Sequence, residues 1–295
     1  MTVSFHLSPE QEKLKLGARQ FAEEHLRPLA GEVRKEPDPL RRALLARPAF
    51  EKAVAEGFLR ALIPAAFGGA ATGGVEACIL IEEWACHSPD FVISLAGPLI
   101  ALAPVYEAGT PEQIQRYVAP FLAGHGAPVA AMAFSEPDGT ANFAAPPPAE
   151  GLRTTAVPDG DWWVVNGRKA WASHLAGWDG IGPDVMTIVC RTPGGVSLIV
   201  AEREHLAGHI EVEEHYDLVG LRGCMISRIG LHDVRVPRSN ILGAEGQGAR
   251  RGLSLCADRE TRRRRADHRA PVRGRCPRGR EEPDGGGKAS HLACA

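Results

Sequence analysis

The amino-acid sequence predicts a multidomain α+β protein, in which an N-terminal all-α helical domain precedes an antiparallel β-barrel domain. Helix start signals and helically spaced apolar residues fill the first part of the chain, and short β-rich runs separated by turn residues begin at about residue 127. The last 45 residues fit neither pattern. We therefore expect a helical domain over 1–125, a β-barrel domain over 126–243 and a segment of another kind over 244–295.

Two helix starts have the same sequence form. Ser8 is followed by Pro-Glu-Gln, and Thr110 is followed by the same three residues. This is a capping box, with proline at the first helical position, where its missing N–H costs nothing. We expect helices to begin there, the first reaching about Leu26. Apolar stretches bounded by Gly and Pro predict further helices at 48–58, 75–86 and 91–106.

The strand pattern follows the helical part. Candidate strands are 129–134, 152–157, 162–165, 169–172, 185–190, 196–201, 209–213 and 226–236. Asn166-Gly167 lies between two of these runs, which is a strong hairpin signal. Closely spaced strands without intervening helices favour an antiparallel barrel or sandwich. The GxGxxG and GxxxxGK[ST] fingerprints of dinucleotide-binding and P-loop proteins are absent from the sequence.

Charge is distributed unevenly along the chain. The net charge is -2, but the stretch from Arg251 onward holds 12 of the 34 Lys and Arg residues and 6 of the 36 Asp and Glu residues, so it carries +6 and the rest carries -8. The acidic body argues against nucleic acid or an anionic membrane as a partner. The start of the chain lacks the pattern of an export signal, and no run of about 18 apolar residues indicates a membrane span.

Seven cysteines without a CxxC pair are typical of reduced core thiols in a cytoplasmic protein. The arginine-rich stretch after Arg250 has no apolar periodicity and cannot form a helix bundle. A nucleic-acid-binding arm is one interpretation of this stretch. Translation of a GC-rich gene in the wrong reading frame is the interpretation that we favour.

One loop stands out as a candidate binding site. Residues 133–142, AFSEPDGTAN, end a strand-like run and gather backbone amides and hydroxyls, a combination that can hold an anionic or acceptor-rich ligand. The same residue types also form simple turns. The residues of this loop alone therefore leave both interpretations open.

Residues 133–142 resemble the signature of the acyl-CoA dehydrogenase superfamily, in which Ser or Thr, Glu and Pro precede a glycine-rich loop over the flavin. Residues 162–173 resemble the family's segment with an aromatic strand, Asn-Gly, Lys and Trp-x-Ser. Gly220-Leu221-Arg222-Gly223 and the strand after it resemble its closing β segment. The likeness covers about residues 5–250.

This resemblance implies FAD as the cofactor and assigns roles to five residues. Ser135 would bond the pyrimidine edge of FAD, Thr140 and Asn142 would lie near the pyrophosphate, Trp171 would pack against the isoalloxazine, and Ser173 would reach its N5 side. A flavin that accepts hydride needs a flat apolar wall and donors that stabilise the reduced ring. We expect a small-molecule substrate and homo-oligomers among intact family members.

The substrate class stays open between two branches of the family. The first alternative is an acyl-CoA dehydrogenase, which oxidises an acyl-CoA thioester by proton abstraction and hydride transfer to flavin N5. The form SEPxGTAN, with Ala141 at the usual serine, resembles the nitroalkane oxidase branch instead. Residues 220–223 are more similar to true acyl-CoA dehydrogenases, in which Arg222 is a candidate orienter of the catalytic carboxylate.

The resemblance also implies a C-terminal four-helix domain that supplies the catalytic base. Four helices need roughly 90 residues, and 45 residues of the wrong kind follow Arg250. We therefore expect this domain to be missing and assign no catalytic base. An inactive truncated remnant is the third alternative.

A metal site is not expected. His205, His209 and His215 lie close in sequence to Glu211, Glu213 and Glu214. The alternation in HIEVEEH instead predicts the exposed face of a strand.

Overall fold

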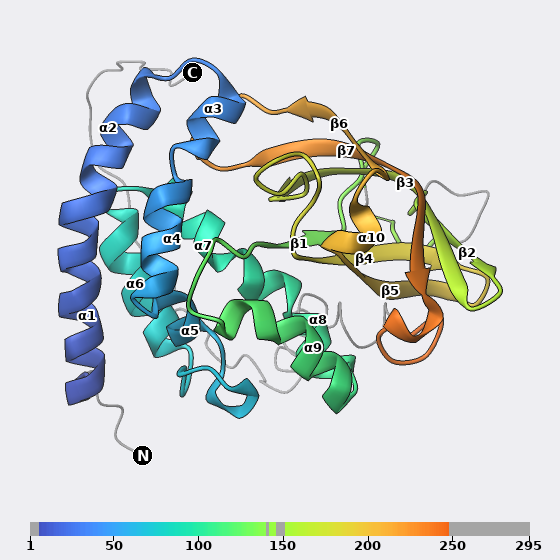
Figure 1. The fold of residues 1–295 in the computed structure, drawn as a ribbon, viewed down its shortest axis with the longest axis horizontal. Helices are drawn as coiled ribbons and strands as arrows, with labels where there is room; N and C mark the ends of the chain where they lie inside the picture. Colours follow the sequence, from blue (N-terminus) through green and yellow to red (C-terminus); the bar gives the residue numbers. More distant parts are fainter. Residues whose placement is uncertain (1–5, 140–141, 146–150, 248–295) are drawn as a thin grey trace, which may run out of the picture. The chain divides into compact units, whose positions relative to one another are not determined.

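The computed structural model describes residues 6–139, 142–145 and 151–247, which all belong to one compact unit. Helices gather on one side of this unit and strands on the other (Figure 1). The helices are α1 (Pro9–Phe21), α2 (Arg27–Lys35), α3 (Pro39–Leu44), α4 (Arg47–Ala55), α5 (Phe58–Leu62), α6 (Val75–Ala85), α7 (Pro89–Ala101), α8 (Ala103–Ala108) and α9 (Pro111–Leu122). A π-helical turn, η1 (Ala22–Leu26), joins α1 to α2, and a 3-10 turn, η2 (Ala65–Phe67), follows α5.

Both capping boxes are confirmed. The Ser8 hydroxyl accepts a bond from the Gln11 backbone N–H at 3.2 Å, and the Gln11 side chain accepts one from the Ser8 N–H at 3.0 Å. Thr110 and Gln113 repeat the arrangement at 3.3 and 2.9 Å. Each box satisfies two backbone donors that a helix start otherwise leaves unpaired.

The helices pack around an aromatic centre. Phe21 contacts the rings of Phe58, Trp84 and Phe91 at centroid distances of 5.3 to 6.0 Å. The stretch Pro89–Ala108 is apolar and long enough to cross a membrane by length and composition alone, with a mean hydropathy of 1.6. Because 56% of it is buried inside the protein, its apolar side chains pack in the core.

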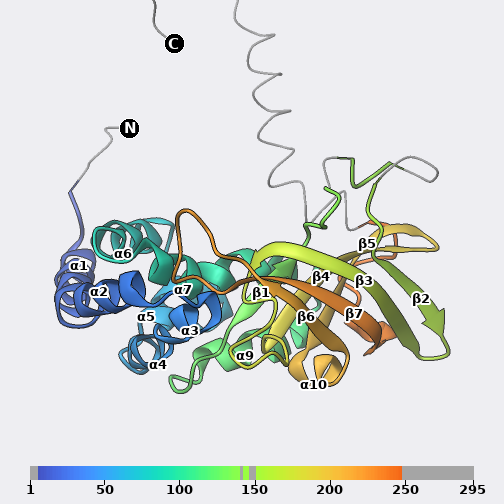
Figure 2. The same cartoon turned by 90° about the horizontal axis from the view of Figure 1, so that it is seen from above.

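The strands form one sheet. They are β1 (Ala130–Ala133), β2 (Thr155–Asp159), β3 (Trp162–Ser173), β4 (Val185–Thr192), β5 (Gly195–Glu202), β6 (Ile210–His215) and β7 (Ile226–Pro237), with α10 (Arg203–Leu206) after β5 and η3 (Arg238–Asn240) after β7. Their order is β1-β4-β2-β3-β7-β6, and β5 pairs with β4. Figure 2 shows β3, β7 and β6 as neighbouring strands of the sheet.

The sheet is curled and mixed, which confirms the predicted fold class with one difference. Most neighbours are antiparallel, but β4 runs parallel to both β1 and β2. A long connection that contains β2 and β3 separates β1 from β4, so no hairpin forces them to be antiparallel. The curl brings the segment after β7 back to β5, where the Leu242 N–H donates to the Leu198 carbonyl at 2.9 Å.

The predicted Asn166-Gly167 hairpin is wrong, because β3 runs through both residues and the hairpin turn lies between β2 and β3. The strand carries a bulge at this point instead. The Asn166 side chain exchanges two 2.9 Å bonds with Asp233 on β7. A Cβ on Gly167 would lie 2.6 Å from the Thr154 hydroxyl oxygen, so glycine serves close packing here.

β4 separates two cores. Met186, Ile188 and Cys190 face the inside of the curled sheet, whereas Val185 and Val189 join the helical core. The Thr187 hydroxyl donates to the Ala101 carbonyl of α7 at 2.7 Å. This burial on both faces explains why β4 reads as a continuous apolar run.

The prediction of buried cysteines is confirmed for Cys190 and Cys224 and wrong for Cys78 and Cys86. Both exceptions lie on the exposed side of α6, or at its end, although their sequence neighbours are apolar. Helical periodicity turns them outward while Ile79 and Leu80 point into the core.

Candidate functional site

Residues 133–142, which we call the signature loop, begin at the end of β1, and a hydrogen bond joins them to β3. Ser135, half-buried, accepts a 3.0 Å hydrogen bond through its carbonyl oxygen from the Ala170 N–H. The Gly139 N–H closes a turn on the Glu136 carbonyl at 2.9 Å. The loop therefore has a defined backbone path from Ser135 to Gly139.

Trp171 follows Ala170 directly and has unusual geometry. Its backbone has a φ of 60°, a left-handed value that is rare for a bulky residue, and its side chain is 51% exposed. Such strain is found most often at functional sites. A large indole left open to solvent beside the signature loop is a surface on which a flat ligand can pack.

Ser173 ends β3, where it pairs with Ile226 of β7. The close approach of α7 sets its surroundings, because a Cβ on Gly97 would lie 3.0 Å from the Ala130 carbonyl oxygen and 3.9 Å from the Ser173 hydroxyl. Glycine at this point lets α7 lie directly against β1 and the end of β3. Ser173 thus lies beside α7, three residues beyond the Ala170 that holds Ser135.

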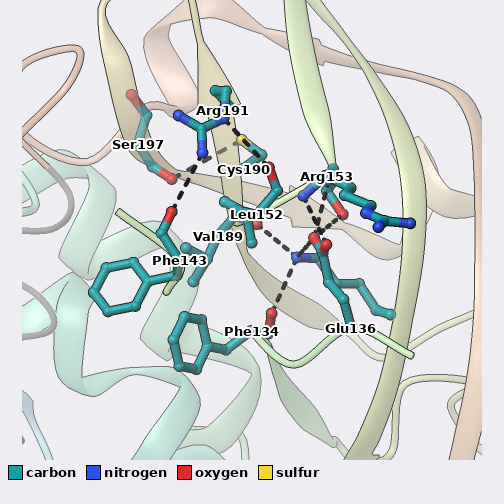
Figure 3. Close-up of polar contacts among 11 residues, drawn as sticks. Phe134, Glu136, Phe143, Leu152, Arg153, Val189, Cys190, Arg191 and Ser197 are labelled. Carbon is teal, nitrogen blue, oxygen red and sulfur yellow. Dashed lines mark hydrogen bonds and ion pairs between the residues drawn. The ribbon is translucent and has the colours of Figure 1, made fainter. Parts of the chain in front are cut away.

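Glu136 of the signature loop forms a buried ion pair with Lys169 of β3. Figure 3 shows Glu136 beside Phe134, Arg153 and Val189. Lys169 Nζ donates to the Glu136 carboxylate at 2.9 Å and to the carbonyls of Phe134 and Val189 at 3.2 and 2.7 Å. Glu136 also accepts bonds from the Thr154 hydroxyl at 2.6 Å and from the backbone N–H groups of Thr154 and Arg153 at 2.9 and 2.7 Å. Every donor of the ammonium group has an acceptor.

Each charge of the pair shifts the pKa of the other group. Burial raises the pKa of Glu136, but the Lys169 charge and the bonds from Thr154 and Arg153 outweigh it, so the pKa lies below its ordinary value. Burial lowers the pKa of Lys169, and Glu136 opposes that shift. The carboxylate is therefore ionised at neutral pH and holds its partner.

Arg191 on β4 fixes the chain beyond the signature loop. Its guanidinium donates to the carbonyls of Ala145 at 2.7 Å and Leu152 at 3.3 Å. Phe143 in this segment packs edge-on against Phe134 at 5.3 Å. Asn142 is exposed, and Thr140 lies outside the described residues, so their predicted roles stay predictions.

Arg222 lies in the connection between β6 and β7. The Met225 carbonyl in this connection accepts a 2.7 Å bond from the His174 N–H, so the connection meets the end of β3 beside Ser173. Fully buried Arg42 donates to the Arg222 carbonyl at 2.7 Å and pairs with Asp217. The Arg222 side chain itself is 40% exposed and lies 3.4 Å from Asp217.

A carboxylate also approaches this connection. A Cβ on Gly223 would lie 3.0 Å from the Asp90 carboxylate at the start of α7. Burial raises the pKa of Asp90, although the Gly223 N–H and the charges of Arg42 and Arg222 oppose the shift. The end of β3, the signature loop and the Arg222 connection together form the candidate site.

The histidines and glutamates near β6 have protein partners. Glu213 pairs with Arg168 and Arg228, and the His215 ring bonds the Ser227 hydroxyl at 3.0 Å. Within the described residues, Glu202, Glu204 and His205 bring ligand atoms within 4.8 Å of one another. Arg116 already pairs with both of these glutamates, and His205 accepts a backbone bond from Glu202, so these contacts account for the cluster.

Sequence reasoning assigned no role to Glu136, Lys169, Arg191 or His174. Glu136 and Lys169 stood in the two motifs, but a buried pairing across 33 residues has no local signal. His174 is fully buried and has a φ of 57°, and neither of its ring nitrogens has a hydrogen-bond partner among the described residues. The one sequence signal for Lys169 is its charge within a strand that also carries apolar residues, because a buried charge needs a partner.

The residues present fit an isoalloxazine ring. A flat, half-exposed indole on a strained backbone adjoins the Ser135 loop, and the Ser173 hydroxyl ends the same strand. A flavin needs an apolar wall and hydroxyl or amide donors in this combination. The site thus has the right kinds of group, supplied by the loop after β1 and by the end of β3.

Known proteins resemble this chain over most of its described length. The family profile of the acyl-CoA dehydrogenase N-terminal domain matches residues 8–125. The chain is 36% identical over 269 residues to a nitroalkane oxidase of Podospora anserina, covering 85% of this chain and 61% of that protein. It is 29% identical over 249 residues to human mitochondrial short-chain specific acyl-CoA dehydrogenase, covering 83% and 56%.

A solved structure of the Podospora anserina nitroalkane oxidase gives a TM-score of 0.79 at 32% identity, over 87% of this chain and 63% of that one. A probable acyl-CoA dehydrogenase from Mycobacterium abscessus gives 0.68 at 29% identity. The chain therefore spans less than two thirds of the length of these relatives.

Proposed function

Because this chain belongs to the acyl-CoA dehydrogenase superfamily, we propose that its loop after β1 and the end of β3 hold the isoalloxazine ring of FAD in an oxidoreductase that acts on a small molecule. The observation that carries the proposal is the direct joining of Ser135 to the strand that bears Trp171 and Ser173. When bound, FAD supplies the acceptor for the electrons that leave the substrate.

The chain's own residues would bind and orient the ring. The Trp171 indole would cover one face and exclude water from it. Ser135 would donate to the pyrimidine edge, where negative charge gathers on reduction, and Ser173 would donate at the N5 side. Thr140 and Asn142 would lie nearer the pyrophosphate.

The proton that leaves the substrate carbon needs a base within hydrogen-bond reach. The family resemblance implies that this base comes from a C-terminal helical domain, and this stays a prediction. Arg222 would orient it, because the connection that carries Arg222 meets the end of β3 beside Ser173. The rigid anchor that Arg42 provides would keep this connection in place.

Nitroalkane oxidation is the first candidate reaction, because the Podospora relative is 36% identical and the human acyl-CoA dehydrogenase 29%. In the sequence analysis acyl-CoA dehydrogenation was the first alternative, so this order is reversed. Acyl-CoA dehydrogenation stays the second candidate because Gly220 to Gly223 resembles that branch. In the first reaction a nitroalkane would give an aldehyde or ketone and nitrite.

The test uses the full chain loaded with FAD under anaerobic conditions. Bleaching of the flavin absorbance by the preformed anion of nitroethane, which needs no catalytic base, with nitrite released on return to air, is expected for the first candidate. Bleaching by butyryl-CoA alone would establish the second. A flavin-loaded chain that responds to neither would support the inactive remnant.

A further inference from the structure

Burying the Glu136–Lys169 pair carries a large desolvation penalty. The two side chains are 3% and 0% exposed. Removing two charges from water costs free energy that their attraction repays only with good geometry, and well-packed apolar residues of similar size are often no less stabilising. The pair therefore calls for a contribution other than stability.

The contacts of the pair indicate that contribution. Lys169 holds the carbonyls of Phe134, in the signature loop, and Val189, in β4. Glu136 holds Arg153 and Thr154, the two residues that precede β2. Apolar side chains could fill this volume, but they would leave the buried carbonyl and N–H groups without partners.

Ser135 lies at the centre of this arrangement. The carbonyl of Phe134, the residue before it, accepts a bond from Lys169. The carboxylate of Glu136, the residue after it, accepts bonds from Lys169 and Thr154. The carbonyl of Ser135 itself accepts a bond from the Ala170 N–H. Three consecutive residues are thus fixed from β3, so the backbone that directs the Ser135 hydroxyl has little freedom.

We propose that Glu136 and Lys169 are positioning residues of the flavin site, which fix the backbone on both sides of Ser135 and so aim its hydroxyl at the pyrimidine edge. This inference rests on the proposed function, because it gives the pair a role in binding FAD. It assigns no contact with FAD to either side chain.

The test compares E136Q, K169M and the double variant E136Q/K169M in the full chain. Each single variant leaves one buried charge unpaired and is expected to lose stability in urea. The double variant removes both charges and is expected to regain part of that stability. Its Kd for FAD is nevertheless expected to rise at least about tenfold, and amides of residues 133–139 are expected to exchange with deuterium faster than in the wild type.

A merely structural pair predicts another pattern, in which FAD affinity returns together with stability in the double variant. A double variant with a wild-type Kd and wild-type exchange over 133–139 would overturn the proposal. The matched control is E51Q, which removes the Glu51 charge from the exposed pair with Arg47 and is expected to change neither quantity.

Should the double variant fail to fold, E136D gives the same decision. It keeps both charges but shortens the link to Lys169, so it is expected to fold and to bind FAD at least about tenfold more weakly. An unchanged Kd would overturn the proposal. If the wild type itself binds no FAD, the proposed function fails, and deuterium exchange over 133–139 still decides whether the pair fixes the loop.

Discussion

The Ala170 N–H donates a 3.0 Å hydrogen bond to the carbonyl oxygen of Ser135. Ser135 follows β1 and Ala170 lies in β3, with 34 residues between them, so the bond joins two motifs that are separate in sequence. Trp171 comes next in the chain and leaves its indole half exposed. This single contact puts a hydroxyl-bearing loop beside a flat apolar wall.

Trp171→Ala is expected to weaken FAD binding at least about tenfold, or ~1.4 kcal/mol, because the indole is the proposed wall of the site. Stability in urea should change little, since the ring is 51% exposed. Quenching of flavin fluorescence measures the Kd. Trp162→Ala on the same strand is the control. Trp162 is 39% exposed, pairs with Asp159 at the opposite end of β3 from Ala170, and contacts the Arg235 guanidinium. Equal losses in both variants would refute the assignment.

Arg42→Met is expected to lower the free energy of unfolding by about 2–4 kcal/mol, because the carbonyl oxygens of Arg222 and Glu36 lose a fully buried donor. Neighbouring Arg41, with a side chain 69% exposed, provides the comparison. Arg41→Met should change stability by less than about 0.5 kcal/mol. Urea unfolding followed by circular dichroism distinguishes the two, and similar losses would contradict the anchoring of the Arg222 connection.

His174 should make stability depend on pH. Burial lowers the pKa of His174 to about 3 in the folded chain, against an ordinary value of 6.5. Between these values the unfolded chain binds a proton that the folded chain does not, so stability is full above 6.5 and falls as the pH drops toward 3. The expected loss from pH 7.5 to pH 5 is about 2 kcal/mol.

His174→Asn isolates this effect, because asparagine tolerates the left-handed backbone but does not titrate. Its unfolding free energy should fall less between pH 7.5 and pH 5 than that of the wild type, by about the same 2 kcal/mol. Parallel pH profiles for the two proteins would show that His174 is protonated in the folded state.

Local signals predicted most of the fold. The capping boxes at Ser8 and Thr110 fix helix starts through contacts three residues apart, which a sequence displays directly. Asn166-Gly167 failed because its conformation is decided by Asp233 on β7 and Thr154 before β2. The parallel pairing of β4 with β1 is likewise set by long-range topology.

The candidate site divides in the same way. Ser135, Trp171 and Ser173 stood in recognisable motifs, and the bond from Ala170 to Ser135 joins their segments in the structure. The supports of the site were beyond sequence reasoning, because Lys169 reaches Val189 and Arg42 reaches Arg222 across distant parts of the chain. A polar residue needs its buried partners before its role can be read.

Equilibrium binding of FAD to the full chain tests the central claim most directly. The account predicts saturable binding of one FAD per chain with a Kd in about the micromolar range, weakened by Trp171→Ala and unchanged by Trp162→Ala. Absence of saturable binding by a folded wild-type chain, or binding that ignores Trp171, would contradict the account.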